Sequence, residues 1–135
     1  MKNYLILFSL CLVIASGYVD NSFNPQWEDC HPNQVWVTHE VTLDRVPAPN
    51  KEVTFQLCGE NAHFYVIPFK EMKITAGDFL EETVSLKDVQ VVWKSHYCFE
   101  YTTTLPSQVD EGLVYNFTFV SIVGTVGCTN VSVYV

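Results

Sequence analysis

The chain has 135 residues, of which 15 are Asp or Glu and 7 are Lys or Arg, and its formal net charge at pH 7 is −8. A nucleic-acid-binding protein needs a basic surface for the phosphates, so this balance argues against that class. It also argues against strong electrostatic docking of the whole protein on anionic membranes, and we expect the acidity to serve solubility.

The first 17 residues predict a secretory signal peptide. Lys2 supplies a short basic start, an apolar run covers Tyr4–Ile14, and the small residues Ala15 and Gly17 stand just before the expected cleavage site. The apolar run is too short for a membrane-spanning helix, which takes about 20 residues. We therefore expect an exported protein, either secreted or held in the lumen of endosomes and lysosomes.

Residues 18–135 form the expected mature chain. Its length is 118 residues, which is 135 less the 17 of the signal peptide, and this suits one domain with its own core. Four cysteines remain in it: Cys30, Cys58, Cys98 and Cys128. An even number in an exported domain predicts two disulfides, for which three connectivities are possible. The wide spacing of the cysteines, and the scatter of the four histidines, predict no metal site.

Hydrophobic and polar side chains alternate along most of the mature chain, which is the pattern of half-buried β-strands. In the first clear strand Val35, Val37 and Val41 would face the core. Trp36 would then face outward. The expected strands cover residues 35–43, 52–57, 62–69, 72–76, 84–93, 97–105, 113–123 and 129–135. Seven or eight short strands, separated by turn residues, predict an immunoglobulin-like antiparallel β-sandwich.

Two N-glycosylation sequons, at Asn116 and Asn130, lie in the last two expected strands. A glycosylated asparagine faces solvent, so the strand pleat turns its neighbours inward. These inward residues are Tyr115, Phe117, Phe119, Val131, Val133 and Val135. Cys128 shares the parity of Asn130, so we expect it at an edge or beyond a bulge near Gly127. Cys30, on a neighbouring edge strand, is the natural candidate for its partner.

Four segments follow one another in a distinctive order. "WEDC" precedes the alternating "VWVTHEVTL", then come "VPAPNKEVTFQLCG" and the terminal hairpin "GLVYNFTFVSIVGTVGCTNVSVYV". This order resembles the ML lipid-recognition domain family, which includes sterol-transfer proteins, the ganglioside activator and mite allergens. Pro47, Pro49 and Gly112 match the family pattern in position. Many members carry six cysteines and a Cys-Pro motif, which this chain lacks.

The resemblance implies a disulfide between Cys30 and Cys128, and we pair Cys58 with Cys98 as the second. It further implies two splayed sheets with a lipid cavity between them, and hence binding or transfer of a sterol, fatty acid or phospholipid. The expected partners are that lipid and a membrane receptor or lipid-handling protein. The inward-parity aromatic residues expected to line the cavity are Phe55, Phe64, Trp93, Tyr97, Phe99, Tyr101, Phe117 and Phe119.

An ordinary filled core is the alternative that composition alone supports. The protein would then be a secreted immunoglobulin-like adhesion or receptor-binding module, gripping a partner through Trp36 or residues 62–69. We expect no catalysis and no cofactor, because no Gly-x-Ser-x-Gly motif occurs. The carboxylate pairs Glu81-Glu82 and Asp110-Glu111 are chain neighbours and not an opposed acid and base.

Overall fold

The computed structural model describes residues 22–30, 34–107 and 112–134, so the predicted signal peptide and Val135 lie outside the described residues. Every helix or strand assigned within these ranges is a β-strand, and the described part of the chain holds no helix long and apolar enough to cross a membrane. The strands are β1 (Gln26–Asp29), β2 (Trp36–Leu43), β3 (Glu52–Asn61), β4 (Ile67–Ala76), β5 (Leu80–Ser85), β6 (Gln90–Val91), β7 (His96–Thr104), β8 (Leu113–Ser121) and β9 (Gly124–Val133).

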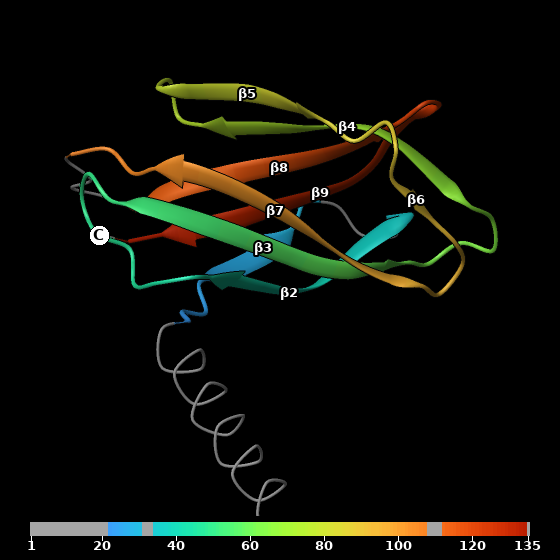
Figure 1. Cartoon of the computed structure of the whole chain (residues 1–135), viewed down its shortest axis with the longest axis horizontal. Helices are drawn as coiled ribbons and strands as arrows, with labels where there is room; N and C mark the ends of the chain where they lie inside the picture. Colours follow the sequence, from blue (N-terminus) through green and yellow to red (C-terminus); the bar gives the residue numbers. More distant parts are fainter. Residues whose placement is uncertain (1–21, 31–33, 108–111, 135) are drawn as a thin grey trace, which may run out of the picture.

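The strands form two antiparallel sheets, which confirms the predicted all-β sandwich (Figure 1). The larger sheet has the order β1-β9-β8-β4-β5, with β6 also paired to β4, and the smaller has the order β2-β3-β7. Strand β2 contacts β1 and β9 across the sandwich. The opposite edges, β7 and β5, therefore lie on the other side of the molecule.

Apolar side chains in loops account for the main differences from the predicted strands. The expected strand 62–69 begins only at Ile67, because residues 62–66 form the connection between β3 and β4. The expected strand 84–93 is broken after β5 by a turn, in which Val89 N donates to the Leu86 carbonyl at 2.8 Å. Strand β1, which lacks a clear alternation, was not predicted.

Trp36 lies on the opposite face from the one predicted. It is fully buried, with its ring 5.3 Å from that of Phe99 and 5.7 Å from that of Phe69, both edge to face. The register of β2 against β3 shifts between Thr38 and Glu40. Such a β-bulge reverses the parity of the strand, so Trp36 faces the core and the prediction that it is exposed is wrong.

The predicted inward face of the last two strands is confirmed. Tyr115, Phe117 and Phe119 in β8, and Val131 and Val133 in β9, are all fully buried. These side chains share one face of each strand, as a period of two requires. The core therefore sits between the sheets, beneath β8 and β9 on one side and β3 and β7 on the other.

Both predicted disulfides are present. Cys58 and Cys98 stand directly opposite each other on β3 and β7, with Cα atoms 4.0 Å apart. Cys30, just after β1, bonds Cys128 of β9 with a Cα separation of 5.2 Å. The register shift in the β8–β9 hairpin is a bulge beside Gly127. Cys128 therefore follows a bulge, as the sequence predicted.

Candidate functional site

The two long sides of the sandwich are closed in different ways. On the β2–β9 side, the Thr38 and Thr129 hydroxyls share a buried hydrogen bond of 2.8 Å between the sheets. The Cys30–Cys128 disulfide ties the chain leaving β1 to β9 within the larger sheet and does not join the two sheets. The side between β5 and β7, which we term the open edge, is joined by a hydrogen bond of 2.5 Å from Tyr101 Oη to Glu82 Oε2.

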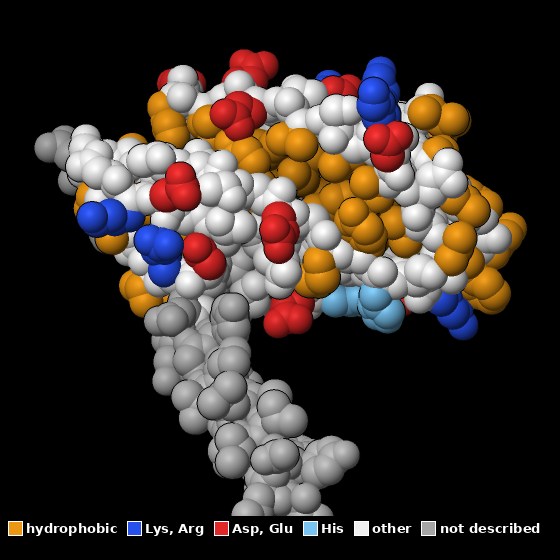
Figure 2. Space-filling view, in the orientation of Figure 1, with side chains coloured by type: hydrophobic (Ala, Val, Ile, Leu, Met, Phe, Trp, Pro, Cys, Tyr) orange, Lys and Arg blue, Asp and Glu red, His pale blue; other side chains and the backbone are white. Residues whose placement is uncertain are grey.

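Apolar side chains line the open edge. Figure 2 shows a band of hydrophobic side chains between β4 and β7 on the face seen there. Leu80 and Val84 of β5 are half-buried against the core, and Leu86 follows them. Glu82 has the same parity as Leu80 and Val84, but it is exposed, so its carboxylate lies at the rim of the open edge where it accepts the hydrogen bond from Tyr101.

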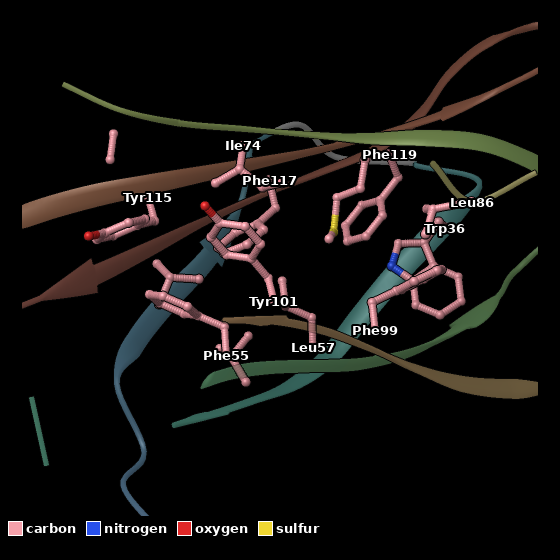
Figure 3. Close-up of a cluster of buried hydrophobic side chains, with 14 of the residues drawn as sticks. Trp36, Phe55, Leu57, Ile74, Leu86, Phe99, Tyr101, Tyr115, Phe117 and Phe119 are labelled. Atoms are coloured by element: carbon pink, nitrogen blue, oxygen red, sulfur yellow. The ribbon is translucent and has the colours of Figure 1, made fainter. Parts of the chain in front are cut away.

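Behind the open edge, five of the eight residues predicted to line a cavity come together. Ring centroids lie 5.3 Å apart for Phe55 and Phe117, 5.0 Å for Phe99 and Phe119, and 6.0 Å for Tyr101 and Phe117 (Figure 3). The rings come from β3, β7 and β8 and meet across the sandwich. Side chains therefore occupy the space where the sequence predicted a lipid cavity.

The other three predicted lining residues lie elsewhere. Phe64, in the β3–β4 loop, is 79% exposed, and Trp93, in the β6–β7 turn, is 51% exposed. Strand parity does not apply to residues outside strands, so the prediction that these two face inward is wrong. Tyr97 lies at the start of β7, partly exposed, with its ring 4.8 Å from that of Phe99.

Two buried tyrosines supply polar atoms to the interior. Burial, followed by the hydrogen bond to Glu82, raises the pKa of Tyr101 to about 12. Burial alone raises the pKa of Tyr115 to about 12. The Tyr115 hydroxyl, like Trp36 Nε1, is buried and has no hydrogen-bond partner among the described residues. The parity of β8 predicted that Tyr115 is inward, but no sequence signal pointed to Trp36.

The sequon residues lie on the outer face of the larger sheet. Asn116 and Asn130 are directly opposed on β8 and β9, and Asn116 Nδ2 donates to Asn130 Oδ1 at 2.8 Å. Glycosylation at either residue stays a prediction. Within the described ranges, no three His, Cys, Asp or Glu side chains gather in a group able to hold a metal ion.

Comparison with known proteins gives a distant structural likeness. No protein-family profile and no curated protein sequence matches this chain. A solved structure of chicken MD-1 complexed with lipid IVa is similar over 78% of this chain and 85% of that chain, at 13% sequence identity and a TM-score of 0.45. A likeness this distant does not carry the ligand of that protein over to this chain.

Proposed function

We propose that this protein is an exported lipid-binding or lipid-transfer protein that holds a lipid tail between its two sheets. The observation that supports it is the asymmetry of the sandwich. On one side β2 packs against β1 and β9, and the Thr38–Thr129 hydrogen bond joins the sheets. On the other side the Tyr101–Glu82 hydrogen bond joins an edge that is lined by apolar side chains. Separation of β5 from β7 gives a tail access to the aromatic cluster behind. Each buried methylene contributes about 0.8 kcal/mol, so a tail needs few specific contacts.

The polar pair at the open edge favours a lipid that donates a hydrogen bond. Tyr101 gives its hydroxyl proton to Glu82, so the pair presents oxygen lone pairs to a ligand. A sterol or other lipid alcohol can donate to these atoms. A fatty-acid carboxylate meets the negative charge of Glu82 instead, so we place sterols ahead of fatty acids among the ligands.

The first test asks whether the purified protein carries a bound lipid. Protein purified from its own secretory pathway should hold an extractable lipid, detected by native mass spectrometry. In Glu82→Gln the like-charge repulsion is absent, so the preference for a fluorescent sterol over a fluorescent fatty acid should fall by about tenfold. An unchanged preference would contradict the role of Glu82, and a protein that binds neither probe would contradict the lipid-binding function.

A recognition module remains the second candidate, because the five aromatic side chains behind the open edge pack against one another and are at most 5% exposed. Of the two surfaces expected to grip a partner, Trp36 is buried and unable to do so. Phe64, Tyr65 and Val66 are exposed and remain available. Absence of lipid from the purified protein, with an intact fold, would favour this candidate.

A further inference from the structure

Three connections at one end of the sandwich expose a cluster of large apolar side chains. They are the β3–β4 loop (residues 62–66), the β6–β7 turn (residues 92–95) and the β8–β9 turn (residues 122–123). We term the cluster the apolar tip, and its side chains range from 42% exposed at Val66 to 85% at Val123. Its members are Phe64, Tyr65, Val66, Val92, Trp93, Ile122 and Val123. Figure 2 shows hydrophobic side chains gathered at the right-hand end of the molecule, where Figure 1 places these connections.

Buried hydrogen bonds hold the tip in place. Asn61 is fully buried, and its Nδ2 donates to the carbonyls of Tyr65 at 2.6 Å and Val91 at 2.9 Å. Its Oδ1 accepts from His63 N at 2.8 Å. One side chain thus fastens the β3–β4 loop to β6, and a shallow groove lined by Tyr65, Val66 and Val123 continues to the β8–β9 turn. The apolar side chains are therefore presented outward by ordered backbone.

The charge of the tip differs from that of the rest of the protein. The chain has 15 acidic residues, yet the three connections contain no Asp or Glu. They contain Lys94, whose Nζ lies 4.7 Å from the centre of the Trp93 ring, and His63, whose ring lies 5.0 Å from that of Tyr65 at a tilt of 49°. A negatively charged surface would meet repulsion over most of this molecule but not at the tip.

We propose that the apolar tip docks the protein, end on, at the surface of a phospholipid bilayer. Trp, Tyr and Lys are the side chains favoured at a membrane–water interface, where the apolar part enters the acyl boundary and the polar part stays with the headgroups. Ile122, Val123 and Phe64 provide the inserting area, and Lys94 reaches the phosphates. The projecting turns suit insertion into a soft surface. This docking requires no cavity between the sheets, so it does not rest on the proposed function.

The test is co-sedimentation of the protein with phosphatidylcholine vesicles, with and without phosphatidylserine. The wild type should bind both kinds of vesicle. Ile122→Ser/Val123→Ser should weaken binding by at least about tenfold, because it removes several inserted carbon groups. Lys94→Glu should weaken binding most on the vesicles that contain phosphatidylserine. Thermal melting of each variant checks that it is folded.

The matched control is Val46→Ser/Val114→Ser, whose two side chains are 67% and 50% exposed and lie outside the three connections. It should bind vesicles as the wild type does. Failure of the wild type to bind either vesicle overturns the proposal, as does an equal loss in the tip and control variants. If the protein binds no vesicle but binds another protein through the apolar tip, the docking proposal is also overturned, and the recognition module is favoured.

Discussion

The close packing around Trp36 depends on glycine at two facing positions. A Cβ placed on Gly127 would lie 3.0 Å from Trp36 Cδ1. One on Gly59 would collide with the Val37 carbonyl oxygen and lie 2.9 Å from Trp36 Cζ2. Both distances are shorter than an ordinary carbon–carbon contact, and the ring has no free space because it is fully buried. The bulge in β2 and these two glycines together make the site for the indole.

Gly127→Ala should therefore destabilise the protein by about 1–3 kcal/mol, as overpacking of a filled core does. The measurement is urea unfolding of the variant beside the wild type. Thr125→Ala, at an exposed position of the same strand, is the control and should change stability by no more than about 0.5 kcal/mol. Equal stability of Gly127→Ala and the wild type would contradict this account of the Trp36 site.

The two buried tyrosines predict loss of stability in alkali. The pKa of each is about 12 in the folded protein and about 10 when exposed, so between these values the unfolded chain releases protons that the folded chain keeps. Their contribution is fully present below about pH 10 and is lost as the pH rises to about 12, by up to about 2–3 kcal/mol for each tyrosine.

Denaturant unfolding across this alkaline range measures the effect. Tyr101→Phe and Tyr115→Phe should each flatten the decline. At neutral pH the two variants should differ, because Tyr101→Phe removes the bond to Glu82 while Tyr115→Phe removes a hydroxyl without a partner among the described residues. We expect a cost of about 1–2 kcal/mol for the first and almost none for the second. A decline as steep in both variants as in the wild type would refute the assignment.

At the scale of the strands, alternation predicted most of the fold. It located the strands that became β2, β3, β7, β8 and β9, and the parity of the sequon residues oriented β8 and β9 correctly. Alternation failed where the backbone departs from a plain strand. The bulge in β2 turned Trp36 inward, and the apolar loop residues Phe64 and Trp93 resembled strand residues because hydrophobicity alone does not distinguish a core from an exposed patch.

The candidate site was only partly accessible to sequence reasoning. Five of the predicted lining residues meet in space because they share inward parity in β3, β7 and β8. The hydrogen bond of Tyr101 to Glu82 joins strands at the outer edges of two different sheets, and no local pattern specifies which edges face each other. Only tertiary packing brings that pair together.

The two disulfides close chain segments of different length. Cys58–Cys98 links neighbouring strands across 40 residues of sequence, and Cys30–Cys128 closes 98. In the chain-entropy model these loops contribute about 4 and about 5 kcal/mol. Replacing Cys30 and Cys128 by Ala should thus cost somewhat more stability than replacing Cys58 and Cys98, measured by thermal melting. Non-reducing peptide mapping that joined Cys30 to Cys58 would contradict both pairings.

At the scale of the whole molecule, the two sheets pack closely along the β2–β9 side, whereas the Tyr101–Glu82 hydrogen bond joins them along the β5–β7 side. The Thr38–Thr129 bond fastens the β2–β9 side, and we propose the β5–β7 side as the entrance. A lipid that binds only the folded protein raises its melting temperature by mass action. The apolar tip lies at the end of the same molecule, where docking on a bilayer would bring the open edge near a source of lipid.

The most direct test is a binding titration of delipidated protein with a fluorescent sterol. Val84 is half-buried at the open edge, and Thr83 is exposed on the opposite face of the same strand. Val84→Trp should obstruct the entrance and weaken binding by at least about tenfold, while Thr83→Trp should bind as the wild type does. If the wild type takes up no sterol, fatty acid or phospholipid, or if both variants bind equally well, lipid does not enter between β5 and β7 and the central claim is contradicted.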